Sequence, residues 1–179
     1  MTERTLFEQN EMNEALRSYL GESYEEVLKE VSVPLTGWPK HVTVVRLDVL
    51  AVGQSGSLVV EIKINCTPYK ITQALGQVRM QRIILREYRD YVEGKYDLVI
   101  REPIEIGVCF ADLPPRYSET HKNKRWMMWN DKCTQLLDEL REEPVKLFLI
   151  RTKADKPSYK ELVPEDLEVV GLLENEELK

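Results

Sequence analysis

The stretch Val42–Asn65, VTVVRLDVLAVGQSGSLVVEIKIN, carries the clearest structural signal in this chain. Two runs rich in β-branched residues flank a short loop that is bounded by Gly53 and Gly56, which is the pattern of a β-hairpin. If the loop consists of these four residues, antiparallel counting places Val52 opposite Ser57. The sequence therefore predicts two adjacent antiparallel strands with a defined register.

Charged residues on these two strands are predicted to face each other. The register places Asp48 opposite Glu61 and Arg46 opposite Lys63. Like charges directly opposite each other destabilise a sheet by up to about 1 kcal/mol a pair. A divalent cation held by the two carboxylates would offset this cost. The alternative is a half-exposed face on which Arg46 and Asp48 pair diagonally with Glu61 and Lys63.

The second strand of the hairpin has the pattern of a strand that is covered on both faces. Leu58, Val60, Ile62 and Ile64 alternate with Glu61 and Lys63, and Val59 shares the charged face. A run with so few polar interruptions is typical of a central strand. Charges on such a strand are costly unless they are paired or bind a metal.

Length and composition predict one globular domain over residues 1–160, followed by an acidic tail at 161–179. The chain has 179 residues, of which 31% are charged and 42% hydrophobic, as is ordinary for a water-soluble protein. Its apolar runs fall short of the roughly 20 residues that span a bilayer, and its N-terminus is polar, so we expect a cytoplasmic protein without a membrane partner. Three cysteines without a CxxC motif predict neither a disulfide framework nor a zinc site.

The net charge of −6 argues mildly against nucleic-acid binding by the surface as a whole. The middle of the chain is more basic, however, and local charge decides where a phosphate backbone can dock. The segment His121–Trp129 mixes basic and aromatic side chains that would suit single-stranded or distorted DNA. Alternatively, its tryptophans belong to the core and its lysines to the solvent. The chain contains no phosphate-binding GxxxxGK[ST] loop, so no nucleotide cofactor is indicated.

Periodicity predicts an α/β sandwich with a mixed sheet. Beside the hairpin, the expected elements are a helix over Glu3–Leu20, a strand within Val27–Leu35, a helix from Thr67–Pro68 to about Gly94, a strand over Ile104–Leu113, a helix over Ser118–Arg141 and a strand over Val145–Arg151. Gln73, Gln77 and Gln81 recur every four residues and so form one stripe on the helix that follows the hairpin.

In this order of elements and in three motifs, the chain resembles the PD-(D/E)XK nuclease superfamily. The motifs are Arg46-Leu-Asp48, Glu61-Ile-Lys63 and Gln73-Ala-Leu-Gly-Gln77, and the resemblance covers roughly Glu8–Leu113. It implies a restriction-endonuclease-like αβββαβ core with a mixed central sheet flanked by helices. It also implies a metal-dependent deoxyribonuclease with DNA as the partner, where branched, single-stranded and duplex DNA are all open, and by analogy a homodimer.

The resemblance assigns roles to individual residues. Asp48 and Glu61, with the backbone carbonyl of Ile62, would bind Mg²⁺ or Mn²⁺, and Lys63 would orient or activate the attacking water. Gln77 would position DNA or that water, and the first helix would add a glutamate, for which Glu14 is the first choice and Glu11 the second. Nucleic-acid contacts would come from Lys70, Gln73, Lys122, Lys124 and Arg125.

Two departures from the family pattern keep an alternative function open. Leu47 precedes Asp48 where the motif name has proline, and Gln81 follows Gln77 at the spacing where relatives often have tyrosine. The alternative is a catalytically silent member of the fold that binds nucleic acid or serves as an assembly subunit. The presence of Asp48, Glu61 and Lys63 together favours an intact site.

Overall fold

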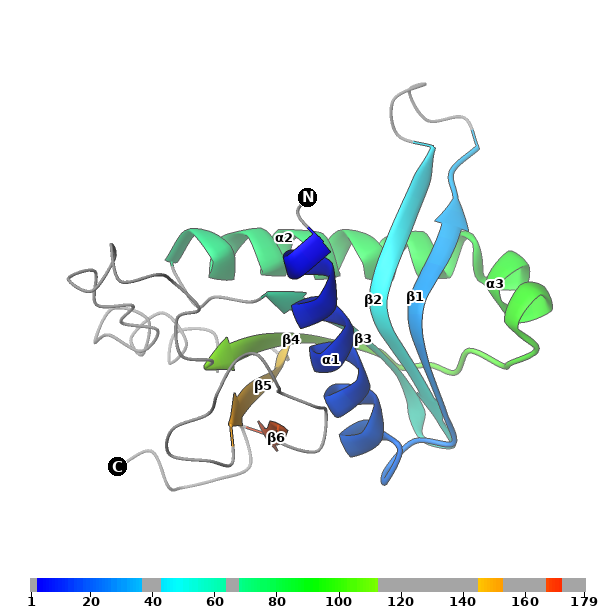
Figure 1. Ribbon diagram of the computed structural model, residues 1–179. Coiled ribbons are helices and arrows are strands. Elements are labelled where there is room, and N and C mark those ends of the chain that lie inside the picture. Colours follow the sequence, from blue (N-terminus) through cyan, green and yellow to red (C-terminus); the bar gives the residue numbers. More distant parts are fainter. Residues whose placement is uncertain (1–2, 37–42, 64–67, 113–144, 153–166, 172–179) are drawn as a thin grey trace.

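A computed structural model describes residues 3–36, 43–63, 68–112, 145–152 and 167–171 of the chain (Figure 1). These residues form an α/β structure with three helices and a single six-stranded open sheet. The elements are α1 (Glu3–Leu20), β1 (Glu26–Pro34), β2 (Val44–Gly53), β3 (Gly56–Lys63), α2 (Pro68–Glu87), α3 (Arg89–Tyr96), β4 (Ile104–Asp112), β5 (Val145–Thr152) and β6 (Leu167–Gly171).

The sheet is mixed, and its strands lie side by side in the order in which they occur in the chain. The pairs β1–β2, β2–β3 and β5–β6 are antiparallel, whereas β3–β4 and β4–β5 are parallel. The crossover from β3 to β4 runs through α2 and α3, as parallel neighbours require. The predicted α/β architecture with a mixed sheet is thereby confirmed.

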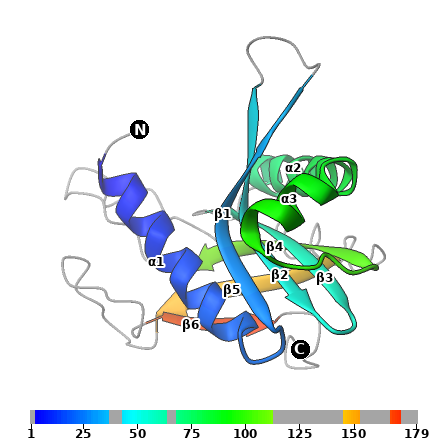
Figure 2. The same ribbon diagram turned by 90° about the vertical axis from the view of Figure 1, so that its right-hand side faces the viewer.

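Two apolar clusters cover the two faces of the sheet. Met12, Leu16 and Leu20 of α1 pack on one face, and residues of α2 and α3 such as Val78 and Val92 pack on the other. Figure 2 shows α1 on one side of the strands and α2 with α3 on the opposite side. Strand β3 is buried along almost its whole length, as predicted from its apolar pattern.

The register of the hairpin is as predicted from the turn to Val49 and Val60, but the ladder stops before the predicted pairs Asp48–Glu61 and Arg46–Lys63. Val52 pairs with Ser57 and Gly53 with Gly56, and the ladder continues to Val49 and Val60. At the next level the backbone pairing ends, which places Asp48 and Glu61 just beyond the last pair of the ladder. Arg46 instead forms an ion pair with Glu30 on β1 at 3.4 Å.

The hairpin formed by β1 and β2 bends at the level of Asp48. Along β2, Leu50 and Leu47 both contact the cluster on the α2 side although they are three residues apart, and along β1 the same holds for Leu28 and Val31. In both strands, the alternation of side chains between the two faces of the sheet therefore shifts by one residue at the level of Asp48. Glu30, which lies on β1 at this level, has a φ of 52°. Beyond the bend, the two strands extend past the rest of the sheet (Figure 1).

The elements differ from those predicted at the end of α2 and in the C-terminal part of the chain. The helix expected to reach Gly94 is interrupted at Tyr88, whose hydroxyl group donates to the carbonyl of Thr36 at 3.1 Å and accepts from its N–H at 3.0 Å. Strand β6 lies within the segment 161–179, where the sequence indicated only an acidic tail. The helix predicted over Ser118–Arg141 lies outside the described residues.

None of the helices described is both long and apolar enough to cross a membrane.

Candidate functional site

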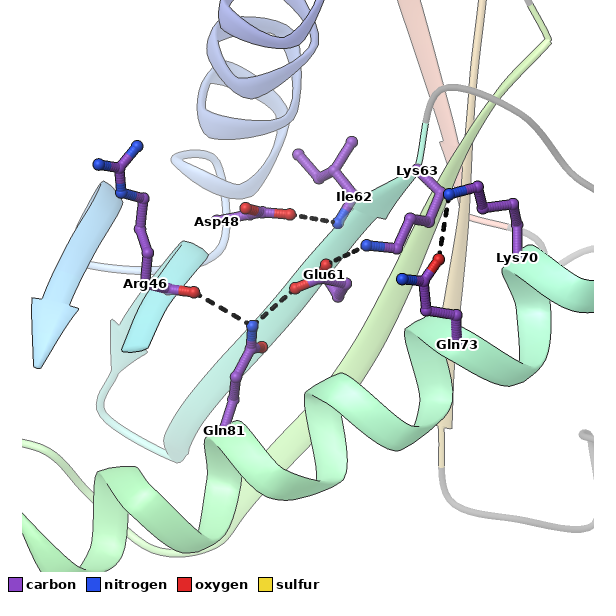
Figure 3. A network of polar contacts seen from close by, with 8 residues as sticks. All are labelled: Arg46, Asp48, Glu61, Ile62, Lys63, Lys70, Gln73 and Gln81. Atoms are coloured by element: carbon purple, nitrogen blue, oxygen red, sulfur yellow. Dashed lines mark hydrogen bonds and ion pairs between the residues drawn. The ribbon is translucent and has the colours of Figure 1, made fainter. Parts of the chain in front are cut away.

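The side chain of Asp48 accepts a hydrogen bond from the backbone of β3 at the point where β2 and β3 separate. Its side chain is buried, with 9% of the residue exposed, and Oδ2 accepts a hydrogen bond from the N–H of Ile62 at 2.8 Å (Figure 3). The carboxylate thus lies between the two strands, close to the backbone that carries Glu61 and Lys63.

Glu61 is held from two directions and is only 4% exposed. One of its oxygens forms an ion pair with the ammonium group of Lys63, whose side chain is 14% exposed. The other oxygen accepts a hydrogen bond at 2.6 Å from Nε2 of Gln81, which comes from α2 (Figure 3). The structure therefore brings Asp48, Glu61 and Lys63 together, and it adds Gln81.

The centre carries more negative than positive charge. Burial, and then the charge of Glu61, raise the pKa of Asp48 from 3.8 to about 7, although the Ile62 N–H and Lys63 act in the opposite direction. Two buried carboxylates with a single ammonium group near them favour the binding of a proton or of a further cation. Such a perturbed carboxylate is a recognised mark of a functional site.

Gln81, rather than Gln77, is the glutamine that reaches the centre. Gln81 is 4% exposed, and its Nε2 also donates to the carbonyl of Arg46 at 3.3 Å. Its Oε1 is buried and has no hydrogen-bond partner within the described residues. Gln77 is exposed on α2, and no contact joins it to the described residues of the centre.

A sequence signal for Gln81 existed in the apolar pattern of α2. The buried positions Ala74, Val78 and Leu85 follow the spacing of one helix face, and Gln81 stands on that face among them. A lone polar residue on an apolar stripe is a better indicator of a buried contact than a run of evenly spaced glutamines.

Glu14, the first choice for a glutamate from the first helix, is not among the described residues that contact Asp48. Glu14 forms ion pairs with Lys29 on β1 and with Arg17 on α1, the latter at 3.5 Å. The hydrogen bond from Lys29 lowers the pKa of Glu14. The side chain of Glu11 lies outside the described residues, so the choice of Glu11 stays a prediction.

The residues expected to contact nucleic acid divide into two groups. Lys70 and Gln73 lie on the first turns of α2, on the side of the centre where Lys63 emerges, and Lys70 Nζ donates to Gln73 Oε1 at 3.0 Å (Figure 3). Lys122, Lys124 and Arg125 lie outside the described residues.

The donor set suits a hard divalent cation that retains water ligands. In the part of the chain that the structure describes, no group of three or more His, Cys, Asp or Glu side chains comes together. Asp48 and Glu61 would therefore need neutral oxygens, such as the Ile62 carbonyl, and waters to complete a coordination sphere. Mg²⁺ and Mn²⁺ accept such a set, whereas a structural zinc site uses four nitrogen or sulfur ligands.

A comparison with models of known protein families gives no match, and no curated protein matches the chain significantly. The function is therefore inferred from the residues of the site and their geometry.

Proposed function

We propose that this protein is a metal-dependent nuclease that hydrolyses DNA phosphodiester bonds at the centre formed by Asp48, Glu61 and Lys63. The observation that carries the proposal is the meeting of two buried carboxylates and a lysine where β2 and β3 part. A fold has no structural need for two buried carboxylates beside each other, since their repulsion destabilises it.

Asp48 and Glu61, with the carbonyl of Ile62, would hold Mg²⁺ or Mn²⁺. The negative charge that raises the pKa of Asp48 to about 7 fits this role, since a cation relieves the same repulsion as a proton. When bound, such a metal ion supplies a water of lowered pKa and neutralises charge on the phosphodiester.

The protein side chains hold the reacting groups in place. Gln81 fixes one oxygen of Glu61 and thereby the direction of the carboxylate. Lys63 is the most exposed of the three charged groups, so its ammonium group can leave Glu61 to donate to a water or to a phosphate oxygen from the solvent side. Its positive charge would then stabilise the extra negative charge that develops on the phosphate during attack.

The arrangement of elements supports the same proposal. The succession α1, β1, β2, β3, α2, β4 agrees with the αβββαβ core that the family resemblance implies, with α3 added before β4. The two carboxylates lie on the second and third strands, and the glutamine lies on the helix that follows them. A restriction-endonuclease-like core is therefore part of the proposal.

A second candidate function rests on how completely Glu61 is paired. Both of its oxygens already have partners, Lys63 and Gln81. A silent nucleic-acid-binding or assembly subunit would keep this network as a structural element and would not need a metal. Cleavage and metal binding separate the two candidates.

The test is cleavage of labelled linear, flapped and four-way-junction DNA by the full chain with Mg²⁺, Mn²⁺ or EDTA. Wild type is compared with Asp48→Asn and Glu61→Gln, which keep the shape of each side chain but remove its charge. We expect metal-dependent cleavage that falls by about 1000-fold or more in either variant, while the circular dichroism spectrum is unchanged.

Cleavage by the two variants at the wild-type rate would show that the site is elsewhere. Binding of DNA by wild type without any cleavage would favour the silent subunit.

A further inference from the structure

Asn13 on α1 is buried without any partner for its amide. The residue is 0% exposed, and neither Oδ1 nor Nδ2 has a hydrogen-bond partner within the described residues. Buried amides are paired in nearly all folded proteins, because an unpaired one loses its hydrogen bonds to water without replacement. A buried side chain of this kind indicates a group that it is placed to meet.

The contacts of α1 place Asn13 over the strand that carries Asp48. The next residue, Glu14, pairs with Lys29, and Lys29 lies opposite Val49 in the β1–β2 ladder. On the other side of the helix, the ring of Tyr19 packs against Phe148 of β5 with their centroids 6.1 Å apart. Asn13 is fully buried and therefore belongs to the sheet-facing side of α1. It lies in the part of the helix from which Glu14 reaches Lys29, and Lys29 lies opposite Val49, the neighbour of Asp48.

Asp48 acts on the α1 face of the sheet as well as on its own strand. Cys109 on β4 belongs to the cluster that α1 covers, and it lies opposite Ile62. Burial raises the pKa of the Cys109 thiol, and the charge of Asp48 raises it further. Ile62, whose N–H donates to Asp48 at 2.8 Å, and Val49, the residue after Asp48, both have their side chains in the cluster that α1 covers. Figure 3 shows α1 on this side of Asp48.

The other buried polar side chains have contacts that account for their burial. The buried polar or charged side chains in the described residues are Asn13, Asp48, Ser57, Glu61 and Gln81. Ser57 accepts a hydrogen bond from the N–H of Arg101 at 2.9 Å, and Asp48, Glu61 and Gln81 form the centre. Asn13 is the member of this set with no contact to account for it.

We propose that the side-chain carbonyl of Asn13 is a further ligand, from α1, of the divalent cation held by Asp48 and Glu61. The inference rests on the proposed function and replaces Glu14 by Asn13 as the residue that the first helix contributes. A neutral amide oxygen suits this position, since Mg²⁺, Mn²⁺ and Ca²⁺ accept carbonyl oxygens. A third carboxylate would add to the repulsion that Asp48 and Glu61 already exert on each other.

The test measures metal binding directly, by calorimetric titration of the full-length protein with Mn²⁺ at pH 8. Asn13→Leu removes the oxygen and keeps the number and branching of the side-chain heavy atoms, Asn13→Asp keeps an oxygen ligand, and Asp48→Asn reports on the centre itself. Glu14→Gln tests the competing residue of α1. The thermal midpoint of each protein is measured in EDTA as a second readout.

We expect Asn13→Leu to weaken Mn²⁺ binding by about tenfold or more. Its thermal midpoint in EDTA should be equal to or above that of wild type, because an apolar group has replaced an unpaired amide. Asn13→Asp should still bind Mn²⁺, with an affinity that depends more steeply on pH, because one more carboxylate must lose its proton.

Wild-type affinity in Asn13→Leu, together with loss of binding in Asp48→Asn, would overturn the role of Asn13 and leave the proposed function standing. Loss of affinity in Glu14→Gln equal to that in Asn13→Leu would also overturn it. If wild type binds no Mn²⁺, the proposed function and this inference fail together. If Asn13→Leu does not fold, Asn13→Asp decides, and an unchanged pH dependence of its Mn²⁺ affinity would contradict the inference.

Discussion

Asp48 shows how strongly one residue is changed by its surroundings. An exposed aspartate would have a pKa of 3.8, but burial and the neighbouring charge of Glu61 raise that of Asp48 to about 7. Between these two values the folded protein keeps a proton that the unfolded chain releases. The contribution of Asp48 to the free energy of unfolding therefore falls as the pH rises from about 4 to about 7.

Asp48→Asn should stabilise the metal-free protein in this range of pH. The gain is expected to be small near pH 4, to grow with pH and to level off above pH 7, at about 4 kcal/mol at most for a shift of this size. Urea unfolding in EDTA at pH 4, 6 and 8 measures it. The exposed Asp97→Asn is the matched control, and an equal gain for Asp48→Asn at all three pH values would contradict the prediction.

Gln81 and Gln77 differ by one helical turn and should differ in function. Gln81→Leu removes a 2.6 Å hydrogen bond to Glu61, so the carboxylate loses its fixed direction. We expect cleavage to fall by about tenfold or more, as for other residues that orient a metal ligand. The rate of DNA cleavage at saturating Mg²⁺ measures the effect.

Gln77→Leu is the control for this comparison, because Gln77 is exposed on the same helix. A larger loss of cleavage in Gln77→Leu than in Gln81→Leu would restore the original prediction from the sequence, in which Gln77 positions DNA or the attacking water.

At the scale of elements, the bend of the hairpin depends on one unusual backbone conformation. Glu30 has a φ of 52°, in the left-handed region that residues with a Cβ atom rarely adopt. Its side chain forms an exposed ion pair with Arg46 at 3.4 Å, which contributes little to stability. The bend shifts the alternation of β1 and β2 and so determines how Asp48 is presented to Ile62.

The variant Glu30→Gly should therefore have a higher free energy of unfolding than the variant Glu30→Ala. Both Glu30→Gly and Glu30→Ala lose the ion pair with Arg46, but only glycine relieves the strain of the positive φ. We expect Glu30→Gly to exceed Glu30→Ala by about 1 kcal/mol in the free energy of unfolding. Chemical denaturation of the two variants measures the difference, and equal stabilities would show that the backbone is not strained at this residue.

Side chains from α1, from α3 and from the break between α2 and α3 contact the backbone of β1 and of Thr36, which follows it. Arg17 of α1 donates to the carbonyl of Val27 at 3.2 Å, and the hydroxyl groups of Tyr96 and Tyr88 accept from the N–H groups of Ser32 and Thr36, each at 3.0 Å. Such contacts occupy backbone groups that would otherwise invite pairing with another strand. The break between α2 and α3 at Tyr88 is therefore linked to the position of β1.

At the scale of the whole molecule, a homodimer stays a prediction from the family resemblance. A two-fold dimer would present two centres formed by Asp48 and Glu61 to the two strands of a duplex, and most soluble oligomers have such symmetry. Light scattering after size-exclusion chromatography should give about twice the 20.9 kDa of the chain. A mass of one chain at all concentrations would contradict the prediction and favour a single centre that acts on one strand.

Local patterns in the sequence account for most of the elements and for the register of the hairpin near its turn. The span of α1, the pairing of Val52 with Ser57 and the burial of β3 follow from residue spacing, turn glycines and apolar alternation, which are properties of neighbouring residues. The meeting of Asp48 with Glu61 follows from that register almost directly. The strand within residues 161–179 was not predicted, because a short segment among acidic residues has little periodicity of its own.

Which side chains surround those carboxylates depends on the packing of elements that are distant in the sequence. Whether Gln77 or Gln81 reaches Glu61 depends on the rotation of α2 about its axis, and that rotation is set by all the apolar residues that the helix buries. The pairing of Glu14 with Lys29, the burial of Asn13 and the raised pKa of Asp48 likewise arise from elements that are distant in the sequence. Burial and electric field are properties of the packed molecule, so no local pattern of residues carries them.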